Sequence, residues 1–138
     1  MSGHKVLLDS NIIIYLSKGL LDIGSIFEKY DELYISIITY MEVLGFQFAD
    51  KKELSLIKEL LNSFEIINLN SEIAEDVISI KQKKKIKLPD AIIWATAKFV
   101  GSDLSTRNVK DFCDISDDVN IINPFAEQGD GKDKKRSP

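Results

Sequence analysis

The sequence has little cysteine and histidine: Cys113 and His4 are the only ones among its 138 residues. A single cysteine excludes a disulfide-stabilised scaffold and fits a reducing compartment. One cysteine and one histidine do not suffice for the usual zinc site. A lone histidine close to the N-terminal edge also argues against Ser-His-Asp or Cys-His catalysis. The side chains that remain for chemistry are mainly carboxylates.

Glycine and long apolar runs are also scarce. The seven glycines are scattered and form neither G-x-G-x-x-G nor a Walker loop, so nucleotide-cradling folds lack their main signature. No run of about 18 apolar residues predicts a membrane span. The first residues do not resemble a signal peptide, since an apolar segment and a small-residue cleavage site are missing. We therefore expect a cytoplasmic protein with no membrane partner.

Composition and charge indicate one globular domain. Hydrophobic residues make up 44% and charged residues 29%, too apolar for a disordered chain. We expect residues 1–126 to form the domain and residues 127–138 a polar, disordered tail. The net charge is −4, although residues 129–138 carry four basic and two acidic side chains. An acidic protein of this kind binds nucleic acid only through a local basic patch or a bound cation.

Short apolar runs alternate with amphipathic segments along the chain. The pattern predicts strands at residues 5–8, 33–36, 65–69, 104–106 and 119–122. It predicts helices at residues 12–16, 22–30, 38–48, 51–62, 71–84 and 89–100, with order ending at Pro124. This alternation is typical of an α/β fold in which helices cover both sides of a central parallel sheet, an α/β/α sandwich.

Three acids, Asp9, Glu42 and Asp90, follow predicted strands or open predicted helices. Ligands of parallel sheets bind beyond the carboxyl ends of the strands, where right-handed crossovers can bring distant residues together. Two unit charges about 4 Å apart repel by roughly 4 kcal/mol at an effective dielectric near 20, so a proton or a cation must neutralise such a cluster. Oxygen ligands alone favour Mg²⁺ or Mn²⁺, which can activate water against a phosphodiester.

Each acid also has a structural interpretation. Asp9 precedes Ser10 and Asn11 and could cap a helix. Thr39 to Glu42 matches a capping box, and Asp90 near a helix start gains from the macrodipole. The shared placement at strand ends favours a joint site over three separate caps.

Four blocks of sequence together resemble the PIN domain, and in particular the VapC-type toxins of toxin–antitoxin pairs. They are VLLDSN at residues 6–11, SIITYMEVL at 36–44, LPDAIIWATA at 88–97 and STRNVKDF at 105–112. The resemblance extends over about residues 5–125. It implies a PIN-like fold, a Mg²⁺- or Mn²⁺-dependent endoribonuclease, a homodimer and a cognate antitoxin protein as partner.

The resemblance also implies roles for individual residues. Asp9, Glu42 and Asp90 match the three central acids, which are the metal ligands of the family. Many members have a further acid where this chain has Asn108, and Asp111 offers a carboxylate three residues later, so one metal or two stays open. The catalytic set is then Asp9, Glu42, Asp90, Asn108 and Asp111. The small polar residues that line the site are Ser10, Asn11 and Thr106.

A lysine-rich segment immediately precedes Asp90. Five lysines lie within residues 81–87, and lysines supply sequence-independent affinity for phosphates. We assign RNA binding to Lys83, Lys84, Lys85, Lys87 and Arg107. The alternatives are a solvated helix end for the lysines and a surface ion pair for Arg107. Trp94 fits a core or dimer contact better than base stacking.

Other functions fit the sequence less well. A PIN-type module that binds RNA or protein without catalysis is compatible with Asn108 replacing an acid. A haloacid-dehalogenase-like phosphohydrolase needs an acid two residues after Asp9, where this chain has Asn11. A response-regulator receiver needs clustered acids near the first strand and a lysine after the fifth. A metal-dependent ribonuclease is the hypothesis that uses the most residues.

Overall fold

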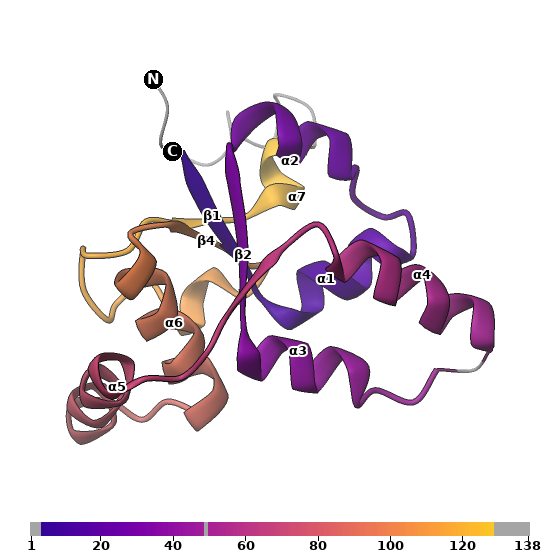
Figure 1. Ribbon diagram of the computed structural model, residues 1–138. Coiled ribbons are helices and arrows are strands. Elements are labelled where there is room, and N and C mark those ends of the chain that lie inside the picture. Colours follow the sequence, from indigo (N-terminus) through magenta and orange to yellow (C-terminus); the bar gives the residue numbers. More distant parts are fainter. Residues whose placement is uncertain (1–3, 49, 129–138) are drawn as a thin grey trace.

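The computed structural model describes residues 4–48 and 50–128 and contains a five-stranded sheet (Figure 1). Its strands are β1 (Lys5–Leu8), β2 (Glu32–Ser36), β3 (Glu65–Ile67), β4 (Asp103–Ser105) and β5 (Ile121–Ile122). The helices are α1 (Ser10–Ser17), α2 (Ile23–Lys29), α3 (Ile37–Leu44), α4 (Lys51–Leu61), α5 (Ser71–Lys83), α6 (Leu88–Val100) and α7 (Pro124–Gln128), with a 3₁₀ turn η1 (Val109–Asp111). None of the helices in these residues is long and apolar enough to cross a membrane.

The sheet is parallel throughout, with the strand order β3-β2-β1-β4-β5. The first strand therefore lies in the centre, between β2 and β4. The carboxyl ends of all strands lie at the same end of the sheet. The chain returns to the opposite end mainly through helices, as parallel pairing requires. The predicted α/β fold with a parallel central sheet is confirmed.

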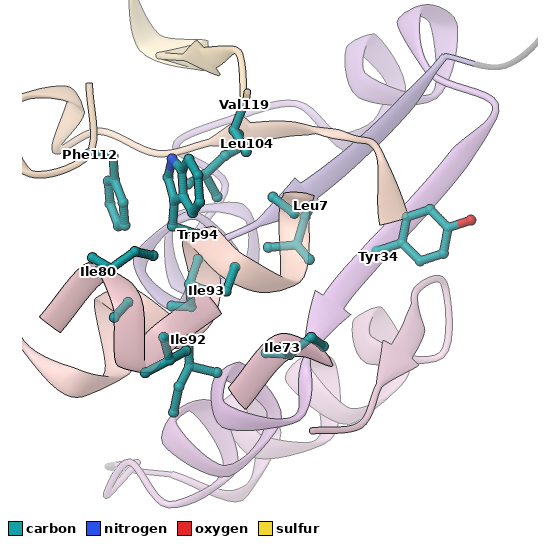
Figure 2. Close-up of a cluster of buried hydrophobic side chains, with 14 residues drawn as sticks. Leu7, Tyr34, Ile73, Ile80, Ile92, Ile93, Trp94, Leu104, Phe112 and Val119 are labelled. Atoms are coloured by element: carbon teal, nitrogen blue, oxygen red, sulfur yellow. The ribbon is translucent and has the colours of Figure 1, made fainter. Parts of the chain in front are cut away.

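Side chains of β1 point alternately into two cores, one on each face of the sheet. Leu7 belongs to a cluster with α5 and α6, which also contains Trp94 and Phe112 (Figure 2). Val6 and Leu8 belong to a second cluster with residues of α1 and α4. Because every β1 side chain from Val6 to Leu8 is buried, the strand reads as a continuous apolar run. Helices on both faces complete the α/β/α sandwich.

Helix α6 is the most deeply buried helix of the fold. Its seven residues from Ala91 to Ala97 are all buried between the sheet and α5. Trp94 is only 3% exposed, as expected for a core residue. Pro89 stands in the first turn, where its missing N–H costs nothing, and Gly101 ends the helix with a φ of +73°. These signals fix Asp90 in the first turn of a rigid element.

The C-terminal part differs from the sequence expectation. Pro124 does not end the ordered structure but begins α7, because the Asn123 side chain accepts a hydrogen bond from Phe125 N at 2.9 Å and so caps the new helix. Helix α3 also ends earlier than expected, at Leu44 rather than at residue 48, with Gly45 as its C-cap. The proposed tail at residues 127–138 lies, from residue 129 onward, outside the described residues.

Candidate active site

Four acids from four segments line one cavity beyond the carboxyl ends of the central strands. Asp9 directly follows β1, Glu42 lies in α3 after β2, Asp90 lies in the first turn of α6, and Asp111 ends η1 after β4. The cavity has a volume of about 610 Å³. Ser10, Asn11, Asn108 and Lys87 also line it. The fold thus brings together residues that are up to about a hundred positions apart in the sequence.

Asp9 is buried, with 6% of its surface exposed, and both of its oxygens are engaged. Oδ1 accepts a hydrogen bond from Ile12 N at 3.1 Å and caps α1. Oδ2 accepts one from the Thr106 hydroxyl at 2.6 Å. The helix-cap interpretation of Asp9 therefore holds, and the same carboxylate also lines the cavity.

Thr106 does not line the cavity but organises it from behind. Its hydroxyl donates to Asp9 and accepts a hydrogen bond from Asn108 N at 3.0 Å. One buried hydroxyl thus fixes the carboxylate after β1 and the backbone of the segment after β4. The sequence-based assignment of Thr106 as a lining residue needs this correction: it is a positioning residue.

Glu42 is not part of a capping box. Ser36 caps α3 by accepting a hydrogen bond from Ile38 N at 3.0 Å, so α3 begins earlier than the capping-box interpretation requires. Thr39 is fully buried within the helix. The exposed Glu42 side chain instead accepts a 2.5 Å hydrogen bond from the Ser10 hydroxyl across the cavity. Ser10 therefore orients this carboxylate toward the end of β1.

The acids influence each other electrostatically. Burial and, to a smaller extent, the charge of Asp90 raise the pKa of Asp9 to about 6, against the lowering effect of its hydrogen bonds. The pKa of Asp90 is also raised, first by burial and then by the negative charge of Asp111, while Lys87 lowers it. Glu42 adds to the increase. Such coupled carboxylates at one cavity mark a candidate functional site.

The donor types fit a hard divalent cation. Carboxylate oxygens, the Asn108 amide and the Ser10 hydroxyl surround the cavity, with neither histidine nor cysteine on its wall. Within residues 4–48 and 50–128, no three acidic, histidine or cysteine side chains are grouped closely enough to hold a metal ion together. Glu42 and Asp111 are exposed, so packing does not confine their side chains to one rotamer.

The predicted RNA-binding residues fall into two places. Lys83, Lys84, Lys85 and Lys87 line a second cavity of about 530 Å³, next to the acidic one. Arg107 lies elsewhere: the centre of its guanidinium is 4.2 Å from the Phe125 ring centroid and 5.4 Å from that of Tyr15. In the part of the chain that the structure describes, Arg107 forms no ion pair, so its contacts are cation–π.

The fold and the acidic cavity define the class of protein: an α/β domain with a carboxylate-rich cavity at the strand ends of a parallel sheet. The family model described as "PIN domain" matches residues 6–117, and the chain belongs to this family. Within the family the chain is VapC-like. PIN nucleases are typically metal-dependent, in agreement with the donor types at the cavity.

Several known proteins are similar to this chain over nearly its whole length. "Ribonuclease VapC2" of Methanocaldococcus jannaschii is 27% identical over 143 residues, with 88% of this chain and 91% of the relative covered. A chain of a toxin–antitoxin complex from Klebsiella pneumoniae is 38% identical, with a TM-score of 0.71 and coverage of 86% and 97%. A chain of VapBC-1 from nontypeable Haemophilus influenzae is 26% identical, with a TM-score of 0.71 and coverage of 88% and 98%.

Proposed function

We propose that this protein is a metal-dependent endoribonuclease and the toxin of a VapBC-like toxin–antitoxin pair. The observation that carries the proposal is the acidic cavity, where Asp9, Glu42, Asp90 and Asp111 meet in a PIN domain. The similarity to Ribonuclease VapC2 and to a chain of a toxin–antitoxin complex supports the activity and the biological role. The catalytic unit is a PIN-like nuclease domain within residues 1–126.

Mg²⁺ or Mn²⁺ is the cofactor that suits these donors, with Asp9, Glu42 and Asp90 as its ligands. When bound, such an ion supplies Lewis-acid chemistry that makes water more acidic and offsets charge on a leaving oxygen. Asn108 and Asp111 complete the site: the amide binds water or a phosphate oxygen, and the exposed carboxylate accepts a proton. Ser10 and Asn11 line the cavity, and Ser10 donates its hydrogen bond to Glu42 there.

The protein's own contribution is to hold these groups in place. Ser10 orients Glu42, and Thr106 orients Asp9, which is also tied to the start of α1. Such partners of metal ligands fix their direction and strengthen binding. Because Asp9 and Asp90 sit on the most buried elements of the fold, the site is built on a rigid base.

RNA is bound by cationic side chains around the cavity. Lys83, Lys84, Lys85 and Lys87 supply contacts to phosphates on one side. Arg107 lies outside both cavities, where cation–π contacts with Phe125 and Tyr15 hold its guanidinium, and it supplies a further phosphate contact.

The partners follow from the same similarity. The toxin–antitoxin complexes of the relatives imply an antitoxin protein that binds this chain. The resemblance to VapC-type toxins supports a homodimer, and RNA as the substrate places the protein in the cytoplasm. A PIN-type module that binds RNA without cleaving it is the second candidate, favoured by Asn108 in place of an acid.

Purified protein tests the proposal directly. We expect it to degrade RNA in Mg²⁺ or Mn²⁺ and to lose this activity in EDTA, with activity restored when excess Mg²⁺ is added back. Gel electrophoresis of end-labelled RNA measures the cleavage and maps the cut positions. RNA that stays intact in both metals, while it is still bound, would favour the binding module.

Thr106→Val tests the positioning of Asp9. Valine keeps the shape of threonine but removes the hydroxyl that donates to Asp9 and accepts from Asn108 N. We expect Mg²⁺ to bind about 10- to 100-fold more weakly, the usual cost of losing a partner of a metal ligand. Calorimetric titration with MgCl₂ measures this affinity, and Thr106→Ser, which keeps the hydroxyl, should bind like the parent protein. Equal affinity of the valine variant would assign Thr106 to the core alone.

A further inference from the structure

The lysines next to the active site form a second cavity rather than a flat patch. Four of them come from the end of α5 and the loop before α6, and the fifth, Lys110, comes from η1 on the opposite wall. Lys110 belongs to none of the groups proposed above. Two segments about 25 positions apart therefore direct positive charge into one space of about 530 Å³.

This lysine cavity adjoins the acidic cavity directly. Lys87, Asp90 and Asp111 line both spaces, so they form a common wall. Lys87 is close enough to Asp90 to lower its pKa, which places the lysine charge beside the proposed metal ligands. A phosphate on one side of this wall is therefore next to a phosphate on the other.

The lysines are available for a ligand. Lys84 pairs with Asp114 at 3.3 Å, but within the described ranges Lys83, Lys85, Lys87 and Lys110 form no ion pair. All four are exposed. Five lysines against the three aspartates of this cavity leave a positive surplus, in a protein that is negative as a whole. A local surplus of this kind selects an anion.

The loop that carries three of these lysines is held in place. Lys81 Nζ donates a 2.7 Å hydrogen bond to Ile86 O, and the Ile86 side chain packs against the core of α5 and α6. The ion pair between Lys84 and Asp114 ties the loop to the segment after η1. Fixed backbone on both walls lets the cavity bind a ligand without first having to order itself.

We propose that the lysine cavity is a subsite for the phosphate that neighbours the scissile phosphate of a single RNA strand, with Lys85 and Lys110 binding it from opposite walls. The inference rests on the proposed ribonuclease function and deepens it. Because the two cavities share a wall, one strand passes from the acidic cavity over Asp90 and Asp111 into the lysine cavity. The subsite lets a protein of net charge −4 hold a polyanion beside its own carboxylates.

Salt-dependent RNA binding tests the subsite. A fluorescent ten-nucleotide single-stranded RNA of mixed sequence is titrated in EDTA, so that cleavage does not interfere. Lys85→Gln/Lys110→Gln removes the two lysines that neutralise this one phosphate. It is expected to reduce the slope of log K against log salt by about 0.7 and the affinity at 0.1 M salt by about 5-fold, at roughly 0.7 per neutralised phosphate. Fluorescence anisotropy measures both quantities.

Two control variants separate this effect from general charge. Lys51→Gln/Lys52→Gln removes the same charge from α4, which lies on the opposite side of the molecule from α5 (Figure 1). It should leave the slope nearly unchanged. Lys85→Arg/Lys110→Arg keeps both charges and should keep the slope. An unchanged slope in the glutamine variant, or an equal loss in the α4 control, overturns the subsite.

Cleavage kinetics locate the phosphate. Once the cut position is mapped, each phosphate near it is replaced in turn by an uncharged methylphosphonate. One replacement next to the cut should raise KM about 5-fold in the parent protein at 0.1 M salt but have little further effect in Lys85→Gln/Lys110→Gln. Equal effects at every phosphate in both proteins overturn the subsite. If RNA binds with a lysine-dependent slope but is not cleaved, the ribonuclease function fails, and the subsite next to a scissile phosphate is overturned with it, leaving the lysine cavity as a binding site for RNA phosphate.

Discussion

Asp90→Asn is expected to reduce metal-dependent RNA cleavage by roughly 100-fold or more. Loss of a partner of a metal ligand already costs about 10- to 100-fold, and Asp90 is itself a proposed ligand. Asparagine has nearly the same shape and remains compatible with the first turn of α6, so the fold should persist. Initial rates of cleavage of end-labelled RNA over a range of MgCl₂ concentrations measure the loss.

The matched control for Asp90→Asn is Glu72→Gln. Glu72 is an acid in the first turn of α5, at an exposed position away from both cavities. Glu72→Gln should cleave RNA like the parent protein. Circular dichroism should show the same fold for Glu72→Gln and Asp90→Asn. Because the charge of Asp90 is coupled to Asp9 and opposed by Asp111, its removal should not lower thermal stability in EDTA. Full cleavage by Asp90→Asn would contradict the metal-site assignment.

Without metal, the folding stability of the protein is expected to fall as the pH rises from 4 to 8. Asp9→Asn is expected to remove most of this fall. The pKa of Asp9 is about 6 in the folded protein and near the ordinary 3.8 in the unfolded chain. The folded state therefore binds this proton more tightly. The stabilisation is complete below about pH 4 and is lost as the pH rises through 6. At about 1.4 kcal/mol per pKa unit, Asp9 alone accounts for a loss of about 3 kcal/mol by pH 8.

Urea denaturation in EDTA between pH 4 and pH 8 measures this dependence. The parent protein should lose stability across the interval, and Asp9→Asn should lose about 3 kcal/mol less. Asp22→Asn is a suitable control. Asp22 also caps a helix, α2, but it lines neither the acidic cavity nor the lysine cavity. If the free energy of unfolding depended on pH in the same way in the parent protein and in Asp9→Asn, the folded structure would not disfavour the ionised form of Asp9. Mg²⁺ should stabilise the parent protein more at pH 8 than at pH 5, because protons compete for Asp9.

Much of the site could be predicted from the sequence because strand ends are visible in it. The apolar run before Asp9 marks the end of a strand, and Pro89 marks the start of the helix that carries Asp90. Because the strands are parallel, the acids after them meet at the carboxyl end of the sheet, and this can be predicted without knowing any side-chain contact. The position of Glu42 was predicted for the same reason, although its structural alternative was wrong.

The remaining features depend on contacts between distant segments. Thr106 and Asp9 are 97 positions apart, and their hydrogen bond leaves no signal in either segment alone. Lys110 was missed because it stands alone in sequence, and its relation to the lysines before α6 arises only when η1 packs beside that loop. The contact of Arg107 with Phe125 likewise required α7, whose start at Pro124 was interpreted as an end.

The central position of β1 has a consequence for synthesis on the ribosome. Asp9 leaves the exit tunnel early, but its neighbour strand β4 begins at Asp103 and its hydroxyl partner is Thr106. A nascent chain that lacks these residues has an unpaired β1 edge and an unsupported carboxylate. The candidate site is therefore assembled only once the chain has been synthesised beyond Thr106, and we expect fragments that end before this residue not to cleave RNA.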